Sequence, residues 1–96
     1  MSLDISRRRE LLMRAEQDIT GVLRVLVASE DRIHEAVATL RAVLADPDTS
    51  EEQARQAREG LVTAARTLRQ LTGFRREIID TRGFIAAADA RLEDLG

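Results

Sequence analysis

Apolar residues recur along the first half of the chain with the spacing of a helical seam. The main row has members at intervals of seven residues: Leu12, Ile19, Leu26, Ile33 and Leu40. A companion row follows three of these positions by four residues, at Leu23, Val37 and Leu44. This spacing is typical of a helix that packs against another helix over several turns. The pattern predicts a helix from about residue 4 to residue 45.

The second half of the chain repeats the pattern with smaller side chains at its start. Its main row is Ala57, Ala64, Leu71, Ile78, Ile85 and Leu92, and its companion row begins Ala54, Leu61 and Leu68. The companion row then turns polar, because Arg75, Arg82 and Asp89 occupy its next positions. We predict a second helix from about residue 51 to residue 95.

A turn separates the two predicted helices at residues 46–50. Pro47 disfavours the helical conformation of the preceding Asp46 and has no backbone donor. Ser50 followed three residues later by Gln53 fits a capping box, which would begin the second helix. The sequence therefore predicts an all-α fold with one domain over residues 1–96, a long antiparallel helical hairpin resembling a coiled coil.

Glycines inside the second helix leave an alternative open. Gly60, Gly73 and Gly83 each cost roughly 1 kcal/mol relative to Ala in a helix interior. Residues 72–74 are the expected place for a kink or a break. A three-helix fold with a break near Gly73 is the alternative to the hairpin.

The segment from Ile19 to Ala28 is apolar around more than one helical face. A hairpin offers each helix only one partner, so the excess apolar surface needs another chain to cover it. We expect the protein to form a homo-oligomeric helical bundle, or to bind another helical protein. The predicted interface residues are Ile19, Val22, Leu23, Val25, Leu26, Val27, Val62, Ile79 and Phe84. In the three-helix alternative, the third helix would cover this surface within one chain.

The amino-acid composition excludes several kinds of functional site and a membrane-spanning segment. Cys is absent, which excludes disulfides, thiolate nucleophiles and cysteine zinc sites. All 15 basic residues are Arg, and the lack of Lys and Asn indicates a GC-rich coding sequence of bacterial or phage origin. No apolar run approaches the roughly 18 residues of a membrane span, and no signal peptide pattern is present. We expect a cytoplasmic protein with no membrane contact.

Arginine provides the strongest functional signal in the sequence. The segment Arg55–Arg76 contains six Arg and one acid, a net charge of +5. Five of these residues fall within an arc of about 80° on a helical wheel: Arg55, Arg58, Arg66, Arg69 and Arg76. Such a stripe is a candidate contact for the phosphates of nonspecifically bound nucleic acid. The alternative is ion pairing with the first helix, where a turn near residue 48 would place Glu30 and Asp31 beside Arg66.

Catalytic chemistry finds little support in the sequence. His34 is the only histidine, and we expect it to face solvent or to be half-buried. Metal binding needs several converging ligands, and paired carboxylates need a pocket that separates their pKa values. No glycine-rich phosphate loop is present. We expect a protein that is not an enzyme and that has no metal or cofactor.

A self-associating helical hairpin with arginines along one side resembles the oligomerisation core of phage small terminase subunits. It equally resembles small secretion chaperones and cell-division coiled coils. The resemblance covers the whole chain and lies in its shape. We expect a helical scaffold or adaptor that acts through protein–protein contacts. The alternatives are a nucleic-acid-binding accessory for DNA packaging and a small secretion or assembly chaperone.

Overall fold

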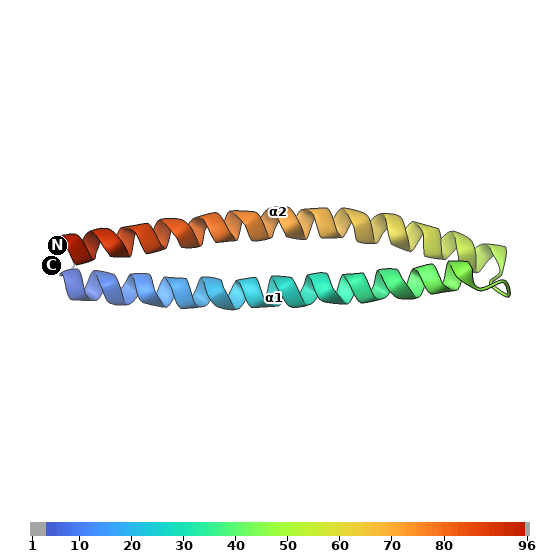
Figure 1. Ribbon diagram of the computed structural model, residues 1–96, viewed down its shortest axis with the longest axis horizontal. Coiled ribbons are helices and arrows are strands. Elements are labelled where there is room, and N and C mark those ends of the chain that lie inside the picture. The colour runs from blue at the N-terminus through green and yellow to red at the C-terminus, as the bar shows by residue number, and fades with distance from the viewer. Residues whose placement is uncertain (1–3, 96) are drawn as a thin grey trace. The chain divides into compact units, whose positions relative to one another are not determined.

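The computed structural model describes residues 4–95, and it confirms the all-α antiparallel hairpin. Helix α1 comprises Ile5–Ala45 and helix α2 comprises Glu51–Leu95. The two helices run in opposite directions on either side of one turn (Figure 1). The Asp4 carboxylate accepts a hydrogen bond of 2.7 Å from the backbone N–H of Arg7, so Asp4 caps the start of α1.

The alternative three-helix fold is wrong, because α2 continues through Gly73. No residue among positions 4–95 has a positive φ, and the glycines of α2 therefore keep helical geometry. A single glycine costs only roughly 1 kcal/mol in a helix. The apolar seam on both sides of Gly73 favours continuation of the helix over a break at this point.

The turn is fixed by the side chains that follow Ala45. The backbone N–H groups of Asp48 and Thr49 donate to Asp46, at 2.9 Å to its carboxylate and 3.2 Å to its carbonyl. The Thr49 hydroxyl donates to the carbonyl of Val43 at 2.6 Å, which satisfies an acceptor in the last turn of α1. The chain therefore reverses through hydrogen bonds that residues 43–49 supply themselves.

The predicted capping box at the start of α2 is confirmed. The backbone N–H of Gln53 donates to the Ser50 hydroxyl, and that of Ser50 donates to the Gln53 side chain, both at 3.1 Å. Glu51 and Glu52 lie in the first turn, where their negative charge suits the N-terminal end of the helix.

Contacts divide the hairpin into two units, each an antiparallel pair of helical segments. The turn unit comprises Leu26–Gly73, which includes the turn. The terminal unit comprises the described residues before Leu26 and after Gly73. In the turn unit the helices approach closely at Gly60, where an added Cβ would lie 3.0 Å from Cδ1 of Leu40. Gly60 therefore admits the Leu40 side chain where a larger residue would press on it.

The register between the helices differs slightly from the one predicted. A turn near residue 48 predicts that the numbers of two opposing residues add up to about 96. The numbers of Arg82 and Glu16 add up to 98, and those of Leu40 and Gly60 add up to 100. Side chains lean toward the N-terminus of their own helix by about one position. In an antiparallel pair the side chains of the two helices lean in opposite directions. The residue numbers of two side chains in contact therefore add up to about two more than those of two directly opposed Cα atoms.

Candidate functional site

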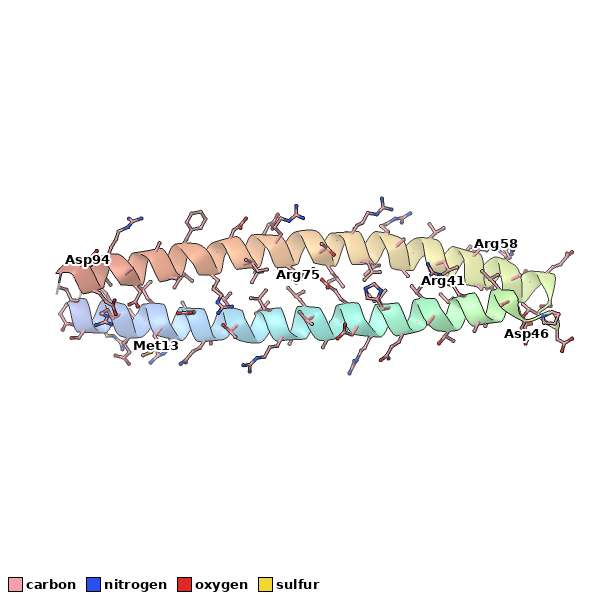
Figure 2. All side chains as sticks on the ribbon, in the orientation of Figure 1. Met13, Arg41, Asp46, Arg58, Arg75 and Asp94 are labelled. Carbon is pink, nitrogen blue, oxygen red and sulfur yellow. The ribbon has the colours of Figure 1, made fainter. Side chains whose placement is uncertain are left out.

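The predicted arginine stripe lies on the surface of α2. All five of its members are exposed: Arg55, Arg58, Arg66, Arg69 and Arg76. Charged side chains stand out from both helices, and Arg58 is labelled near the start of α2 (Figure 2). The seam residues Ala57 and Ala64 occupy the opposite side of this helix. The exposed stripe is therefore accessible to a binding partner.

Arg55 differs from the other members because it is already held within its own helix. Its guanidinium pairs with Glu52 and, at 2.9 Å, with Glu59. The hydrogen bond with Glu52, followed by that with Glu59, raises the pKa of Arg55 above its usual value. Arg55 remains charged, but its donors are occupied by two local carboxylates.

The remaining four arginines of the stripe have no ion pair among residues 4–95. Arg58, Arg66, Arg69 and Arg76 make none within 4.0 Å, so the pairing expected between Arg66 and Glu30 or Asp31 is not formed. Arg66 lies on the side of α2 opposite the seam residue Ala64, so its side chain points away from α1. The N–H donors of these four guanidinium groups therefore face solvent.

The predicted interface residues fall into two groups. Only 8 % of the surface of Leu26 is exposed, and Ile19 and Leu23 are half-buried. These three residues therefore contribute mainly to the seam within the hairpin. The other six are large apolar side chains that the hairpin leaves exposed: Val22, Val25, Val27, Val62, Ile79 and Phe84. Only this second group offers extensive apolar surface to another chain.

Three further exposed apolar side chains were not included in the predicted interface. Ile5, Met13 and Phe74 are each exposed, and all three lie in the terminal unit. Phe74 could have been found from the sequence, because it lies beside the position where the companion row turns polar. Ile5 also could have been found, because it precedes Leu12 by seven residues and so extends the main row of the first helix. Met13 carries no such signal.

Val62 shares a face of α2 with the arginines. At 100° per residue, Val62 lies between the directions of Arg58 and Arg66 on the helical wheel. It is 61 % exposed. The two surfaces predicted separately, one apolar and one basic, therefore coincide on this part of α2.

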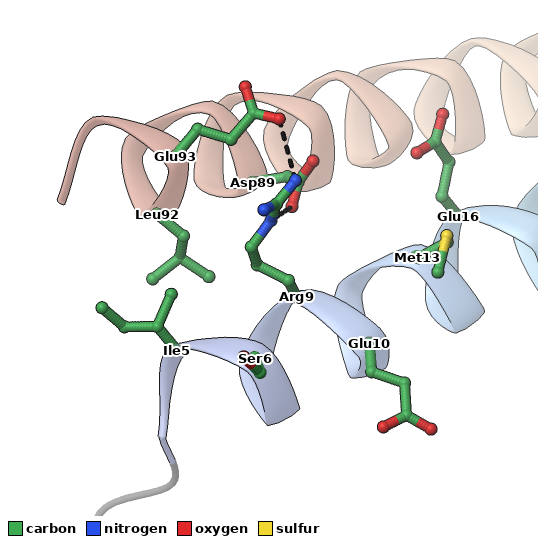
Figure 3. Close-up of a pocket in the computed structure, with 9 residues that line it drawn as sticks. All are labelled: Ile5, Ser6, Arg9, Glu10, Met13, Glu16, Asp89, Leu92 and Glu93. Carbon is green, nitrogen blue, oxygen red and sulfur yellow. Dashed lines mark hydrogen bonds and ion pairs between the residues drawn. The ribbon is translucent and has the colours of Figure 1, made fainter. Parts of the chain in front are cut away.

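The terminal unit has an open groove in which a single arginine joins the helices (Figure 3). Arg9 of α1 pairs with Glu93 of α2 at 2.8 Å and with Asp89 at 3.5 Å. Ile5 and Leu92 lie at one end of the groove, and Met13 lies at the other (Figure 3). Because Arg9 occupies both carboxylates, this cluster serves to hold the two helices together.

An apolar groove also lies in the terminal unit. Leu11, Leu12, Ala88 and Leu92 line it, with Arg8 and Arg91 beside them. Its apolar lining belongs to the seam between the helices, which here is incompletely covered. This groove adds to the apolar surface that the isolated hairpin exposes.

Among the described residues there is no cluster of three or more His, Cys, Asp or Glu arranged to hold a metal ion. His34 is exposed on α1, in agreement with its predicted position. The described helices include no stretch that is both long and apolar enough to cross a bilayer.

Comparison of the chain with protein-family models, with curated proteins and with solved structures found no match.

Proposed function

We propose that this protein is a non-enzymatic helical scaffold that works as a homo-oligomer. The observation that carries the proposal is the surface left exposed by one chain, 7359 Å². A folded monomer of 10.7 kDa exposes about 5,500 Å². The excess of about 1,900 Å² is larger than the roughly 800 Å² that each partner contributes to a standard interface.

The distribution of side chains supports the same proposal. Leu26 and Ala57 are the only buried residues among positions 4–94. Large apolar side chains on both helices remain in contact with water, including Val25 of α1 and Phe84 of α2. Exposed apolar surface of this extent is typical of proteins that associate. A second layer of helices would give the chain the core that one hairpin lacks.

The test is the mass of the protein in solution over a range of concentrations. Multi-angle light scattering at micromolar concentration should give a multiple of 10.7 kDa. A triple variant, Val25→Glu with Val62→Glu and Phe84→Glu, should shift the mass to that of one chain while circular dichroism still shows helix. The matched control adds the same charge at exposed polar positions: Gln17→Glu, Thr39→Glu and Gln56→Glu. A wild-type chain that is stably helical and monomeric at micromolar concentration would contradict the proposal.

A second candidate function is nonspecific nucleic-acid binding. The observation that favours it is that Arg58, Arg66, Arg69 and Arg76 have no ion pair among residues 4–95. Free guanidinium groups along one helix suit the phosphates of a duplex, and repetition in an oligomer would strengthen weak contacts.

Gel-shift titrations at several salt concentrations test this candidate. If the arginines contact phosphates, Arg66→Ala with Arg69→Ala should lower the slope of log affinity against log salt by roughly 1.8. The control is Arg7→Ala with Arg14→Ala, since both of those arginines pair with Glu10. Absence of binding at about 50 mM salt, where phosphate contacts are strong, would remove the candidate.

A further inference from the structure

One side of the terminal unit is formed by matching positions of its two helices. On α1, between positions 8 and 18, it consists of the residues that stand one position before or three positions after a main-row residue: Arg8, Leu11, Ala15 and Asp18. On α2, between positions 77 and 91, it consists of the residues with the same two relations to the main row: Glu77, Thr81, Phe84, Ala88 and Arg91. At 100° per residue each set falls within an arc of about 80°.

The two sets lie on the same side of the terminal unit. The apolar groove is lined from both helices, by Leu11 of α1 and Ala88 of α2, with Arg8 and Arg91 beside it. Phe84 precedes Ala88 by four residues and is 74 % exposed, more than any other large apolar side chain described. We refer to this side as the lateral face. It offers an open groove and an uncovered aromatic ring to a partner.

The charges of the lateral face are separated along its length. Arg8 and Arg91 lie at one end, beside the groove. Asp18 lies ten residues further along α1, and Glu77, with Asp80 at the edge of the face, lies 14 residues back along α2. Because the helices are antiparallel, both displacements run in the same direction. The lateral face is therefore basic at one end and acidic at the other.

These five charged side chains are all exposed, and none has an ion pair within 4.0 Å among residues 4–95. Four other charged residues border the lateral face. Arg7 and Arg14 pair with Glu10, and the Asp4 carboxylate caps the first turn of α1. Asp94 lies outside the span of positions 77–91, at the far end of α2. The polarity of the face is therefore set by the five charges that have no ion pair.

We propose that the lateral face binds the same face of a second copy. Each helix of the terminal unit then packs against the same helix of the other chain, in antiparallel orientation. Along α1, Arg8 faces Asp18 of the second copy, and Leu11 faces Ala15, since the residue numbers of both pairs add up to 26. Twofold symmetry forms each of these contacts twice. The interface rests on the proposed homo-oligomer and specifies one of its contacts.

Along α2 the numbers of the facing residues add up to 168. Arg91 then faces Glu77 of the second copy, and Asp80 lies three residues further along, so one guanidinium lies opposite two carboxylates. Phe84 lies on the symmetry axis, against its own counterpart. The second copy thus covers the aromatic ring that the isolated hairpin leaves in water.

A single axis produces both sets of contacts. It crosses α1 at the level of residue 13 and α2 at Phe84, halfway between the facing residues of each helix. The numbers of Arg9 and Asp89, which pair across the terminal unit, add up to 98. The numbers of the two crossing points add up to 97, so these points lie opposite each other. The charge patterns of α1 and α2 therefore agree on the position of the axis.

The charge pattern also distinguishes between the two face-to-face arrangements. A twofold axis along the helices would place α1 over α2 of the second copy at the same level. Arg8 would then meet Arg91, and Asp18 would meet Asp80, so like charges would face each other at both ends. The antiparallel arrangement brings unlike charges together at both ends. Charges that flank a helical seam set the orientation and the partner of helices in this way.

Disulfide trapping tests the pairing of α2, since the chain has no cysteine of its own. Chains carrying Glu77→Cys are mixed with longer, tagged chains carrying Arg91→Cys and oxidised after exchange. The expected product is a disulfide between the two variants, with none when either is oxidised alone. Like positions lie about 21 Å apart in the antiparallel pair, and a disulfide needs Cα atoms within about 7 Å. The control is Ala90→Cys, which is turned by about 100° from position 91 and should not crosslink with Glu77→Cys.

A charge exchange tests the pairing of α1 independently of cysteine chemistry. Arg8→Asp and Asp18→Arg should each raise the dissociation constant of the oligomer by roughly tenfold, because each turns two unlike pairs into like pairs. The chain that carries both substitutions restores unlike charges and should return to the wild-type value. Arg24→Asp makes the same charge change at an exposed position of α1 outside the lateral face. It should leave the dissociation constant within about threefold of wild type.

The outcomes separate this interface from the scaffold proposal. If the wild-type chain is monomeric by mass, both proposals are wrong. If it is oligomeric but Glu77→Cys fails to crosslink with Arg91→Cys, the scaffold remains and the lateral interface is overturned. The same holds if Arg8→Asp and Asp18→Arg leave the dissociation constant unchanged, or lower it as the parallel arrangement requires. Failure of the double exchange to restore association also overturns the interface.

Discussion

The turn unit and the terminal unit are built from the same two helices but are held together by different interactions. Leu26 and Ala57, the two buried side chains among positions 4–94, both belong to the turn unit. Within residues 4–25 and 74–94 of the terminal unit no side chain is buried, and ion pairs of Arg9 and Arg82 join the helices. The difference follows from side-chain size, because Ala57 and Gly60 allow the helices of the turn unit to approach closely.

The comparison shows where the stability of one chain resides. Buried apolar side chains contribute about 1.5–3 kcal/mol each, whereas exposed ion pairs contribute about 0–1 kcal/mol. We therefore expect the turn unit to resist opening and the terminal unit to open more readily. The following substitutions test that expectation, measured below the concentration at which the chain associates.

The largest effect is expected at Leu26. Leu26→Ala should lower the free energy of unfolding by about 2–5 kcal/mol, because it leaves a cavity between the helices. The control is Val25→Ala at the adjacent position, where the side chain is 65 % exposed. That change should alter the stability by about 0.5 kcal/mol or less. Urea denaturation followed by circular dichroism measures both, and equal effects would contradict the assignment of Leu26 to the seam.

The two helix caps compare the units directly. Ser50→Ala in the turn unit removes the capping hydrogen bond to Gln53 and should cost about 1 kcal/mol of global stability. Asp4→Ala removes the corresponding bond to Arg7 in the terminal unit. We expect this second change to have the smaller effect on global unfolding, since a helix end with few buried contacts opens locally first. Hydrogen exchange of the first turn of each helix would distinguish local from global opening.

Two glycines offer the next smaller contrast. Gly21→Ala in the terminal unit should stabilise the chain by about 0.5–1 kcal/mol, because nothing lies within 4 Å of the added Cβ. Gly60→Ala in the turn unit gains the same helix propensity but presses on Leu40 at 3.0 Å. Thermal unfolding should therefore show a smaller gain for Gly60→Ala than for Gly21→Ala. An equal or larger gain at Gly60 would show that Leu40 moves aside at no cost.

The smallest effect is expected at Arg9. Arg9→Gln removes the ion pairs with Asp89 and Glu93 and should lower stability by less than about 1 kcal/mol. Because the pairs are exposed, the difference from wild type should shrink as salt is added. A salt-independent loss would indicate that the aliphatic part of Arg9 contributes by packing in the groove.

Local sequence patterns were enough to predict most of the fold. Seven-residue spacing identified both seams, and Pro47 with the Ser50 capping box located the turn. These features depend on residues a few positions apart, whose geometry the helix itself determines. Gly73 was harder to interpret, because a propensity cost is local whereas the seam that outweighs it extends over the whole helix.

The surfaces were predicted less well than the fold. Leu26 was assigned both to the seam and to the outer interface, and its burial within the hairpin agrees with the seam. Ion pairing of Arg66 with α1 was expected from residue numbers alone, whereas the helical wheel places Arg66 opposite the seam.

The reversal of the chain at residues 43–49 has a consequence for the order in which the hairpin forms. The Thr49 hydroxyl bond to Val43 spans six residues, whereas the Arg9 bond to Glu93 spans 84. Closing a loop of 84 residues costs about 1.3 kcal/mol more than closing the 20 residues between Leu40 and Gly60. Folding is therefore expected to nucleate at the chain reversal and to proceed outward. Substitutions in the turn unit should then slow folding, and those in the terminal unit should mainly accelerate unfolding.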